Sequence, residues 1–165
     1  FINKYYKPML SHIGKDGNAK MVDISEKENS DRSAIASGFI ELNKETINLV
    51  KIGNLKKGDV LTVAKIAAIQ GSKKTSNLIP LCHNINLNKI DIKFKINTKE
   101  NKIYCQSTVN CSGKTGVEME ALTAVSIALL TIYDMCKASD KNMIISEIKL
   151  LEKHGGKSGS WISQI

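Results

Sequence analysis

Aromatic side chains are scarce in this chain: they make up 5% of its 165 residues. A sheet that binds single-stranded RNA stacks the bases on aromatic side chains. The strands predicted below carry only Phe39, Phe94 and Tyr104, which are scattered along the sequence. A basic RNA-binding module without catalytic activity is therefore the less favoured of the alternatives for this chain.

The chain also lacks a long hydrophobic run and any C-x-x-C pair. Its longest uncharged apolar run is residues 121–133, well short of the roughly 20 apolar residues of a membrane span, so we predict no membrane helix. The cysteines lie within apolar or alternating patterns, which favours reduced, buried thiols. A zinc site built from Cys82, His83 and two distant cysteines is the alternative, although adjacent Cys and His are a poor ligand spacing. The four cysteines are Cys82, Cys105, Cys111 and Cys136.

Positive charge is what the chain has in excess. Its net charge is +8, and of 24 basic residues only Arg32 is an arginine. This balance favours an anionic partner such as nucleic acid, a nucleotide or a phosphate-bearing metabolite. The alternative is that many lysines are simply solvated, because the whole chain is rich in Lys and Asn.

The hydrophobic periodicity predicts strands and helices in a recognisable order. Residues 18–32 predict an initial strand followed by a polar loop. Asn43 or Thr46 is the expected cap of the first helix and Asp59 that of the second, while Pro80 leaves His83 on a loop. The other predicted strands are 32–42, 89–96, 102–111 and 143–153, and the predicted helices are 43–53, 56–75 and 113–137.

This order, strand–helix–strand–strand–helix–strand, is typical of an α+β, ferredoxin-like βαββαβ fold, with an antiparallel sheet and its helices on one face. We predict a single domain over residues 1–165. Residues 1–17 are an N-terminal arm and residues 153–165 a mobile, Gly-rich C-terminal loop.

The third helix has an uncharged middle and charged ends. Glu120 and Asp134 project about 40° apart around its axis and lie roughly 21 Å apart along it, so one small pocket cannot join them. Its middle is apolar nearly all round, which predicts cover on more than one face. Two such helices packed antiparallel across a two-fold axis would bring the Glu end of one near the Asp134 and Lys137 end of the other. The alternative is that these charges only cap the helix, although Asp134 opposes the macrodipole.

Several lysines stand where an anion could bind. Lys56 and Lys57 precede a predicted helix N-terminus, where backbone N–H groups attract phosphate. Lys73 and Lys74 follow that helix, and Lys153 and Lys157 lie in "EKHGGKSGSW", which is not a phosphate-binding P-loop because no helix follows. His83, on its loop, is open to both a functional and a structural role.

Four strings in order, "MVDIS", "KKGDVLTVAKIAAIQGSKKTSNLIPLCH", "GKTGVEMEALTAVSIALLTIYDMCKA" and "LLEKHGGKSG", resemble the molybdenum cofactor biosynthesis protein C family. The resemblance covers roughly residues 10–160. It implies a phosphorus–oxygen lyase that converts 3′,8-cyclo-7,8-dihydro-GTP to cyclic pyranopterin monophosphate and releases pyrophosphate. The corresponding alternative is a ferredoxin-like nucleotide-binding module without catalysis.

The resemblance also implies roles for individual residues. Lys57, Asp134 and Lys137 are the expected catalytic group, and clustering of the lysines is expected to lower their proton affinity. Glu118, Met119 and Glu120 resemble the segment that contacts the guanine-derived base. Arg32 suits bidentate phosphate binding. The residues expected to bind phosphate are Lys27, Arg32, Lys73, His83, Lys153 and Lys157.

The resemblance further implies a hexamer built as a trimer of dimers, with the site at the dimer interface and a radical SAM cyclase acting upstream. We expect no cofactor, no metal site, no nucleic acid and no membrane, with Mg²⁺ as an optional companion of the substrate phosphates. The location is the cytoplasm for a bacterial protein and the mitochondrion for a eukaryotic one. Three positions depart from the family pattern: Lys74 for an arginine, Asn84 for a proline, and "AIQGS" for "GIQAA", which affects helix packing.

Overall fold

The computed structural model describes residues 10–53 and 59–164. Its elements are β1 (Ser30–Glu41), α1 (Lys44–Lys51), α2 (Val60–Lys73), α3 (Thr75–Leu78), β2 (Leu87–Asn97), β3 (Lys102–Gly113), α4 (Glu118–Cys136), β4 (Ile144–His154) and β5 (Trp161–Ile162). The four long strands and the helices α2 and α4 follow the predicted order.

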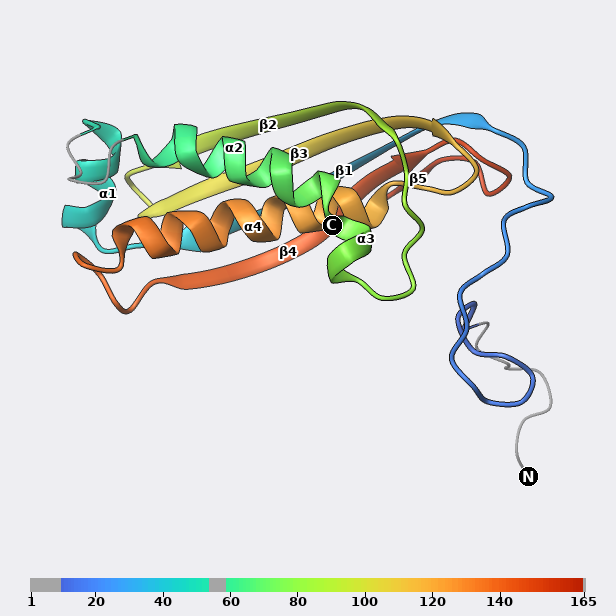
Figure 1. Ribbon diagram of the computed structural model, residues 1–165. Coiled ribbons are helices and arrows are strands. Elements are labelled where there is room, and N and C mark those ends of the chain that lie inside the picture. Colours follow the sequence, from blue (N-terminus) through green and yellow to red (C-terminus); the bar gives the residue numbers. More distant parts are fainter. Residues whose placement is uncertain (1–9, 54–58, 165) are drawn as a thin grey trace.

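The strands form one antiparallel sheet in the order β2-β3-β1-β4-β5. Helices α2 and α4 lie side by side and antiparallel across one face of this sheet (Figure 1). Helix α4 packs on β1, β3 and β4, and α2 packs on α4 and β2. The predicted α+β fold with its helices on one face is confirmed.

Alternation along the strands places the core between the sheet and α4. Ala34 and Ala36 of β1 and Val109 of β3 are fully buried, as are Ala124 and Ala128 of α4. In a strand, every second side chain points to the same face, which explains this regular spacing. Small alanines at the β1–α4 contact let the long helix lie close to the middle of the sheet.

Side chains predicted as caps begin the two helices that follow β1. The Asn43 side chain accepts a hydrogen bond from the backbone N–H of Thr46 at 2.8 Å. Asp59 Oδ1 accepts from the N–H groups of Leu61 and Thr62 at 3.1 and 3.3 Å. These contacts confirm Asn43 and Asp59 as N-caps and satisfy N–H groups that have no partner within the helix.

Helix α4 is the core helix of the molecule. By length and hydropathy its 19 residues are a candidate membrane span, the only such helix in the described part of the chain. Its buried face lies on the sheet and a second side contacts α2, which accounts for its apolar character. It begins at Glu118, five residues later than predicted, because residues 114–117 form the connection from β3.

Two details of the prediction differ from the structure. The expected initial strand within residues 18–32 is wrong, because that segment holds only an isolated bridge between Ile13 and Ala19 before β1 begins. The described part of the N-terminal segment leads away from the sheet (Figure 1). The sequence also missed β5, where Trp161 and Ile162 pair with Lys153 and Glu152 of β4.

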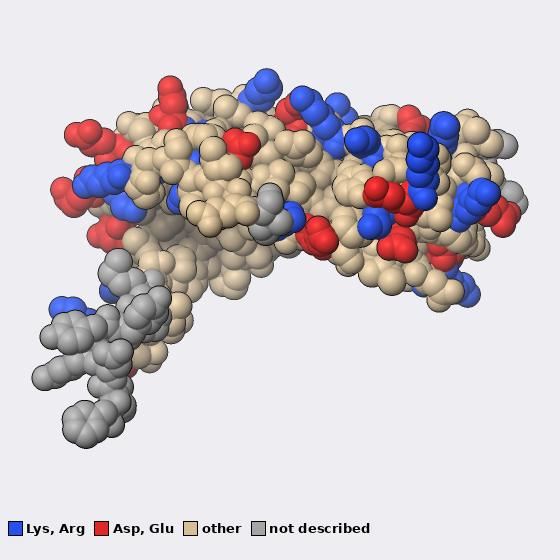
Figure 2. Space-filling view, turned by 180° about the vertical axis from the view of Figure 1, so that it is seen from behind, with Lys and Arg blue, Asp and Glu red and all other residues tan. Residues whose placement is uncertain are grey.

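The face of the sheet turned away from the helices is polar. It carries both signs of charge, as the view from behind shows (Figure 2). Near the end of β1 and the start of β3, Phe39 and Tyr104 lie with ring centroids 5.5 Å apart, and Lys102 Nζ lies 4.4 Å from the Phe39 ring centroid. The two faces of the molecule therefore differ in character.

Candidate functional site

The register of the sheet brings three chain connections together at one end of the molecule. Ser30, at the start of β1, is paired with Gly113 at the end of β3, and Ser33 with His154 at the end of β4. The segments before β1, after β3 and after β4 therefore meet beside the N-terminal end of α4 (Figure 1). Residues far apart in the sequence form one surface there.

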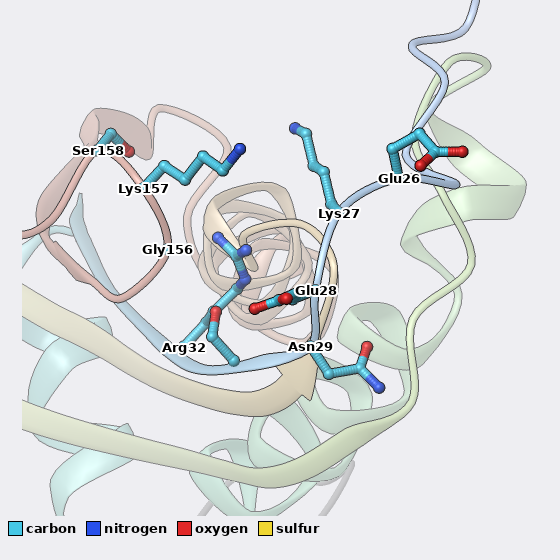
Figure 3. Close-up of a pocket in the computed structure, with 9 residues that line it drawn as sticks. Glu26, Lys27, Glu28, Asn29, Arg32, Gly156, Lys157 and Ser158 are labelled. Carbon is cyan, nitrogen blue, oxygen red and sulfur yellow. The ribbon is translucent and has the colours of Figure 1, made fainter.

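A hollow of about 720 Å³ lies at this end, and we name it the cation pocket after Lys27, Arg32 and Lys157. These three cations come from the segment before β1, from β1 and from the segment after β4. The Lys27 and Lys157 side chains extend into the same space from opposite sides, with the Arg32 guanidinium between them (Figure 3). Glu26 and Glu28 also line it, so its charge is only partly positive. Such a group of cations suits a phosphate chain.

Arg32 is fixed by backbone carbonyls. Its Nε donates to Gly113 O at 2.9 Å and its Nη2 to Lys114 O at 3.3 Å. On the other side Gly156, at φ 78°, lies so close that a Cβ there would be 2.1 Å from Arg32 Nη1. The guanidinium therefore joins the ends of β1 and β3 to the segment after β4, and keeps further N–H donors for a ligand.

A smaller hollow of about 180 Å³ continues from the cation pocket, with which it shares Lys27 and Arg32. Here Lys153 Nζ of β4 contacts Glu118 Oε1 of α4 at 2.9 Å, and both side chains are about 30% exposed (31% and 28%). This ion pair joins the end of β4 to the first turn of α4. It lies between the cation pocket and a third hollow.

The third hollow, of about 300 Å³, lies beside the first turn of α4, and we name it the acid pocket after Glu118 and Glu120. It shares Thr115, Gly116 and Glu118 with the smaller hollow. Its complete lining is His12, Leu81, Cys82, His83, Ile85, Thr115, Gly116, Glu118, Met119 and Glu120. A path of adjoining hollows thus runs from Lys157 to Glu120.

Glu120 is buried, with 4% of its surface exposed. Burial raises the pKa of its carboxyl from 4.5 to about 7, while its own backbone N–H works in the opposite direction and the negative charge of Glu118 adds to the rise. Near neutral pH a large fraction of Glu120 therefore carries a proton. Carboxyl groups with such pKa values are typical of functional sites.

Two buried serines hold the first turn of α4 in place. Ser72 Oγ of α2 donates to Glu120 O at 3.1 Å, and Ser107 Oγ of β3 donates to Ala121 O at 2.7 Å. Both donors are buried, so water competes little for these bonds. The turn that carries both glutamates is therefore fixed to the neighbouring helix and to the sheet.

His83 is bound to the segment before β1. Its Nε2 lies 2.7 Å from Val22 O, and because a carbonyl only accepts, this nitrogen carries a proton. Lys114 Nζ donates to Ser25 O at 2.8 Å. The segment that carries Lys27 is therefore held at two points, at Val22 and Ser25.

The other expected catalytic residues lie at the far end of α4. Asp134 Oδ1 and Lys137 Nζ form an exposed ion pair at 2.6 Å. Asp134 is sixteen residues from Glu118, roughly 24 Å along the helix axis. The hydrogen bond and the charge of Asp134 raise the pKa of Lys137. Within one chain Asp134 therefore opposes the expected lowering of the proton affinity of Lys137; the effect of clustered lysines stays a prediction, because Lys57 lies outside the described residues.

Two further predicted site residues, Lys57 and Lys73, differ in what the structure shows of them. Lys57 lies outside the described residues, but α2 begins three residues later, at the end of the molecule where α4 ends (Figure 1). Lys73 is exposed in the last turn of α2 and lines none of the three hollows. A single chain therefore brings Glu118, Glu120, His83 and most of the phosphate-binding candidates together, but separates them from Asp134 and Lys137.

Sequence reasoning did not single out Asp23, Lys114 or Thr115. Hydrogen bonds from the side chain and then the backbone of Ser25 lower the pKa of Asp23, with a further contribution from the charges of Lys114 and His83. Thr115 lines both the smaller hollow and the acid pocket. The strings "MVDIS" and "GKTG" contain these residues, so they were the available signal.

A zinc site gains no support from the geometry. Within residues 10–53 and 59–164, no three His, Cys, Asp or Glu side chains gather closely enough to hold a metal ion. Cys105, Cys111 and Cys136 are buried thiols, as expected, whereas Cys82 is partly exposed. Cys82 contributes to the wall of the acid pocket instead.

Comparison with known proteins gives consistent matches. A sequence model described as the MoaC family matches residues 21–156. A cyclic pyranopterin monophosphate synthase of Clostridium acetobutylicum is 52% identical over 153 residues, which cover 93% of this chain and 95% of that protein. Proteins of the same name from Peptoclostridium acidaminophilum and Heliobacterium modesticaldum are 51% and 50% identical, over 92% and 94% of this chain and 96% and 98% of their own lengths. A solved structure of the ferredoxin protease FusC with Arabidopsis ferredoxin aligns at a TM-score of 0.33 and 7% identity over 66% of this chain and 10% of that one, a likeness that carries no argument.

Proposed function

The chain belongs to the MoaC family, and we propose that it is a cyclic pyranopterin monophosphate synthase, a lyase of molybdenum cofactor biosynthesis. One observation carries this proposal: the cation pocket and the acid pocket are connected through the smaller hollow at the start of α4. A nucleotide likewise has its phosphate groups at one end and its base at the other, so each end would lie in one of the two pockets. The substrate is 3′,8-cyclo-7,8-dihydro-GTP and the products are cyclic pyranopterin monophosphate and pyrophosphate.

The cations bind the triphosphate in this arrangement. Lys27, Arg32 and Lys157 surround the cation pocket, and Lys153 reaches the same path next to Glu118. Charge-assisted hydrogen bonds from several cations stabilise a phosphate chain and the charge that develops on leaving pyrophosphate. The base lies in the acid pocket against Glu118, Met119 and Glu120.

A second copy of the chain completes the site in this proposal. Asp134 and Lys137 belong to the end of α4 that lies farthest from the acid pocket, and α2, which begins three residues after Lys57 in the sequence, starts at that end. Exposed apolar side chains on the helical face, Val63, Ile66 and Leu130, are 41%, 54% and 55% exposed, whereas the opposite face of the sheet is charged (Figure 2). A two-fold dimer through the helices would cover the apolar side chains and bring each lysine–aspartate end to the partner's acid pocket. Such dimers would then assemble into the expected hexamer.

The Lys57, Asp134 and Lys137 group would then move protons during ring rearrangement. Asp134 holds the Lys137 ammonium at 2.6 Å, so Lys137 is placed as a proton donor. A cyclic monophosphate forms when a hydroxyl oxygen attacks the α-phosphorus and pyrophosphate leaves. The attacking hydroxyl must lose a proton, and Lys57 is the candidate to accept it in a neutral form.

We expect no protein-bound cofactor, and Mg²⁺ enters, where it is needed, with the substrate phosphates. The substrate is supplied by a radical SAM cyclase. The similar proteins come from bacteria, and we place this chain in the cytoplasm of such a cell. The binding module without catalysis remains the competing proposal, and pyrophosphate release separates the two.

The test is pyrophosphate release from 3′,8-cyclo-7,8-dihydro-GTP by wild type, by Lys57→Ala and by the matched control Lys51→Ala on α1. We expect release by wild type and by the control, and a loss of at least about 100-fold in Lys57→Ala, because a general acid or base contributes this much. Size-exclusion chromatography must show the same assembly for all three proteins. Substrate binding without release by wild type would favour the binding module.

A further inference from the structure

The two glutamates at the start of α4 lie in different surroundings. Glu118 contacts the Lys153 ammonium, whereas Glu120 is buried in the wall of the acid pocket. We propose that Glu120 determines specificity as a neutral carboxylic acid, donating a hydrogen bond to the ring carbonyl of the substrate while the Glu118 carboxylate accepts from the ring N–H groups. This inference rests on the proposed function and goes beyond it by assigning opposite protonation states to the two residues.

The geometry gives Glu120 little to stabilise a negative charge. In the described part of the chain, no lysine or arginine forms a salt bridge with its carboxylate. A buried carboxylate without a cation is costly, so the group keeps its proton instead. Its position in the first turn of α4 favours the anion, and its own backbone N–H does too, but burial outweighs both.

The titratable groups around Glu120 come from four segments. Glu118 lies on the same helix and Cys111 on β3, and both are neutral or negative. Cys82 and His83 lie on the segment after α3, and His12 on the N-terminal arm. Burial raises the pKa of Cys82, and the charge of Glu120 adds to the rise. The imidazoles of His12 and His83 are the lining groups that can become cationic, and His83 already donates Nε2–H to Val22 O.

The chemistry of the base explains why two protonation states are useful. A guanine-derived ring presents N–H donors beside a carbonyl acceptor. An ionised carboxylate only accepts hydrogen bonds, whereas a protonated carboxyl also donates one. Glu118 and Glu120 together therefore match a donor–acceptor edge, and a ring with an amino group in place of the carbonyl would leave two donors facing each other. Two carboxyls with different environments and different roles are a recurrent arrangement in enzymes.

The kinetic test compares Glu120→Gln with Glu118→Gln and with the exposed control Glu41→Gln, between about pH 6 and pH 8.5. For wild type, kcat/KM for pyrophosphate release should fall by up to about tenfold per pH unit above pH 7. The reason is that Glu120 ionises and no longer donates a hydrogen bond to the ring carbonyl of the substrate. Glutamine keeps an N–H donor but cannot ionise. In Glu120→Gln, kcat/KM should therefore remain within about threefold of the wild-type value at pH 6 and should not fall above pH 7. In Glu118→Gln, kcat/KM should be at least about tenfold lower than in wild type at every pH and should still fall above pH 7. Glu41→Gln should match wild type.

A loss in Glu120→Gln at pH 6 as large as that in Glu118→Gln would overturn the proposal, because it would show that Glu120 acts as an anion. Persistence of the alkaline decline in Glu120→Gln would overturn it as well. If wild type releases no pyrophosphate, the proposed function is wrong, and so is the role of Glu120 that rests on it. The last outcome is distinguishable because it does not depend on any substitution.

A second measurement needs no substrate. Folding raises the pKa of Glu120 from 4.5 to about 7, so the folded state binds more protons than the unfolded state between these values. The stability that the folded state gains from holding this proton is fully present below pH 4.5 and is lost as pH rises through about 7. In urea unfolding at several pH values, the wild-type stability constant should fall by up to about tenfold per pH unit relative to Glu120→Gln across this window. Parallel pH profiles of the two proteins would show that Glu120 holds no extra proton and would contradict the proposal.

Discussion

Arg32 shows at the scale of one residue why a lysine-rich chain retains an arginine. Its Nε and Nη2 bind the carbonyls of Gly113 and Lys114, and Gly156 packs against Nη1. A lysine ammonium is a single point of charge and cannot span these contacts while facing a ligand. The sequence indicated a bidentate phosphate ligand at this position, but the backbone contacts depend on the sheet register and could not be predicted.

Arg32→Lys should therefore raise KM for the cyclised GTP substrate by at least about tenfold, with a smaller effect on kcat, because it loosens the cation pocket and keeps the charge. Steady-state pyrophosphate release at several substrate concentrations measures both constants. Lys93→Arg on β2 is the control, because it exchanges the same two residue types at a position that does not line the cation pocket. An unchanged KM in Arg32→Lys would mean that only the charge matters.

The two glutamates illustrate the limit of prediction from sequence. The resemblance placed both Glu118 and Glu120 at the base, as equivalent carboxylates. Their separation depends on burial and on Lys153, which reaches Glu118 from β4, 35 residues along the chain. Neither effect is visible in "VEME", because tertiary packing determines which side chain is exposed.

At the scale of elements, the contact between α2 and α4 depends on a glycine. A Cβ added to Gly71 would lie 2.7 Å from Cγ1 and 3.0 Å from Cβ of Ile127. These distances are too short for ordinary packing, and the β-branched Ile127 cannot easily move within a helix. The departure noted at "AIQGS" is therefore a packing feature, as expected.

Gly71→Ala should destabilise the protein by about 1–3 kcal/mol, because overpacking exceeds the gain of about 1 kcal/mol in helix propensity. In an Ile127→Ala background the same change should instead be stabilising, by up to about 1 kcal/mol, since the clash is gone. Urea unfolding of the four proteins of this double-mutant cycle measures the coupling. Equal effects of Gly71→Ala in both backgrounds would show that Ile127 is not the obstacle.

Helices and long strands were predictable because local signals coincide with packing. Asn43 and Asp59 marked the helix starts, and period-two alternation marked β2 and β3. The expected strand before β1 failed for a physical reason. Alternation gives a strand only where a neighbouring strand offers hydrogen bonds, and the described part of that segment does not join the sheet. The short β5 was missed because two residues carry too little pattern.

At the scale of the whole molecule, the predicted site divides into two groups at opposite ends of α4. Helix periodicity alone predicted this separation, and the structure confirms that Asp134 and Lys137 do not share a pocket with Glu118 or Lys153 within one chain. The sequence could not show which face would pair with a second copy. In the proposed dimer, the exposed Val63, Ile66 and Leu130 of the helical face would be covered.

The most direct measurement is pyrophosphate release by a mixture of Asp134→Ala and Lys153→Ala, each of which should be inactive alone. Random reassembly makes half of the dimers mixed, each with one intact site of two, so about a quarter of the wild-type activity should return. A mixture of Asp134→Ala and Lys57→Ala is the control: it should stay inactive, because in the proposed site one chain supplies both Lys57 and Asp134, so no mixed dimer has an intact site. No recovery in the first mixture, when wild type treated in the same way regains full activity, would contradict a site shared between two chains.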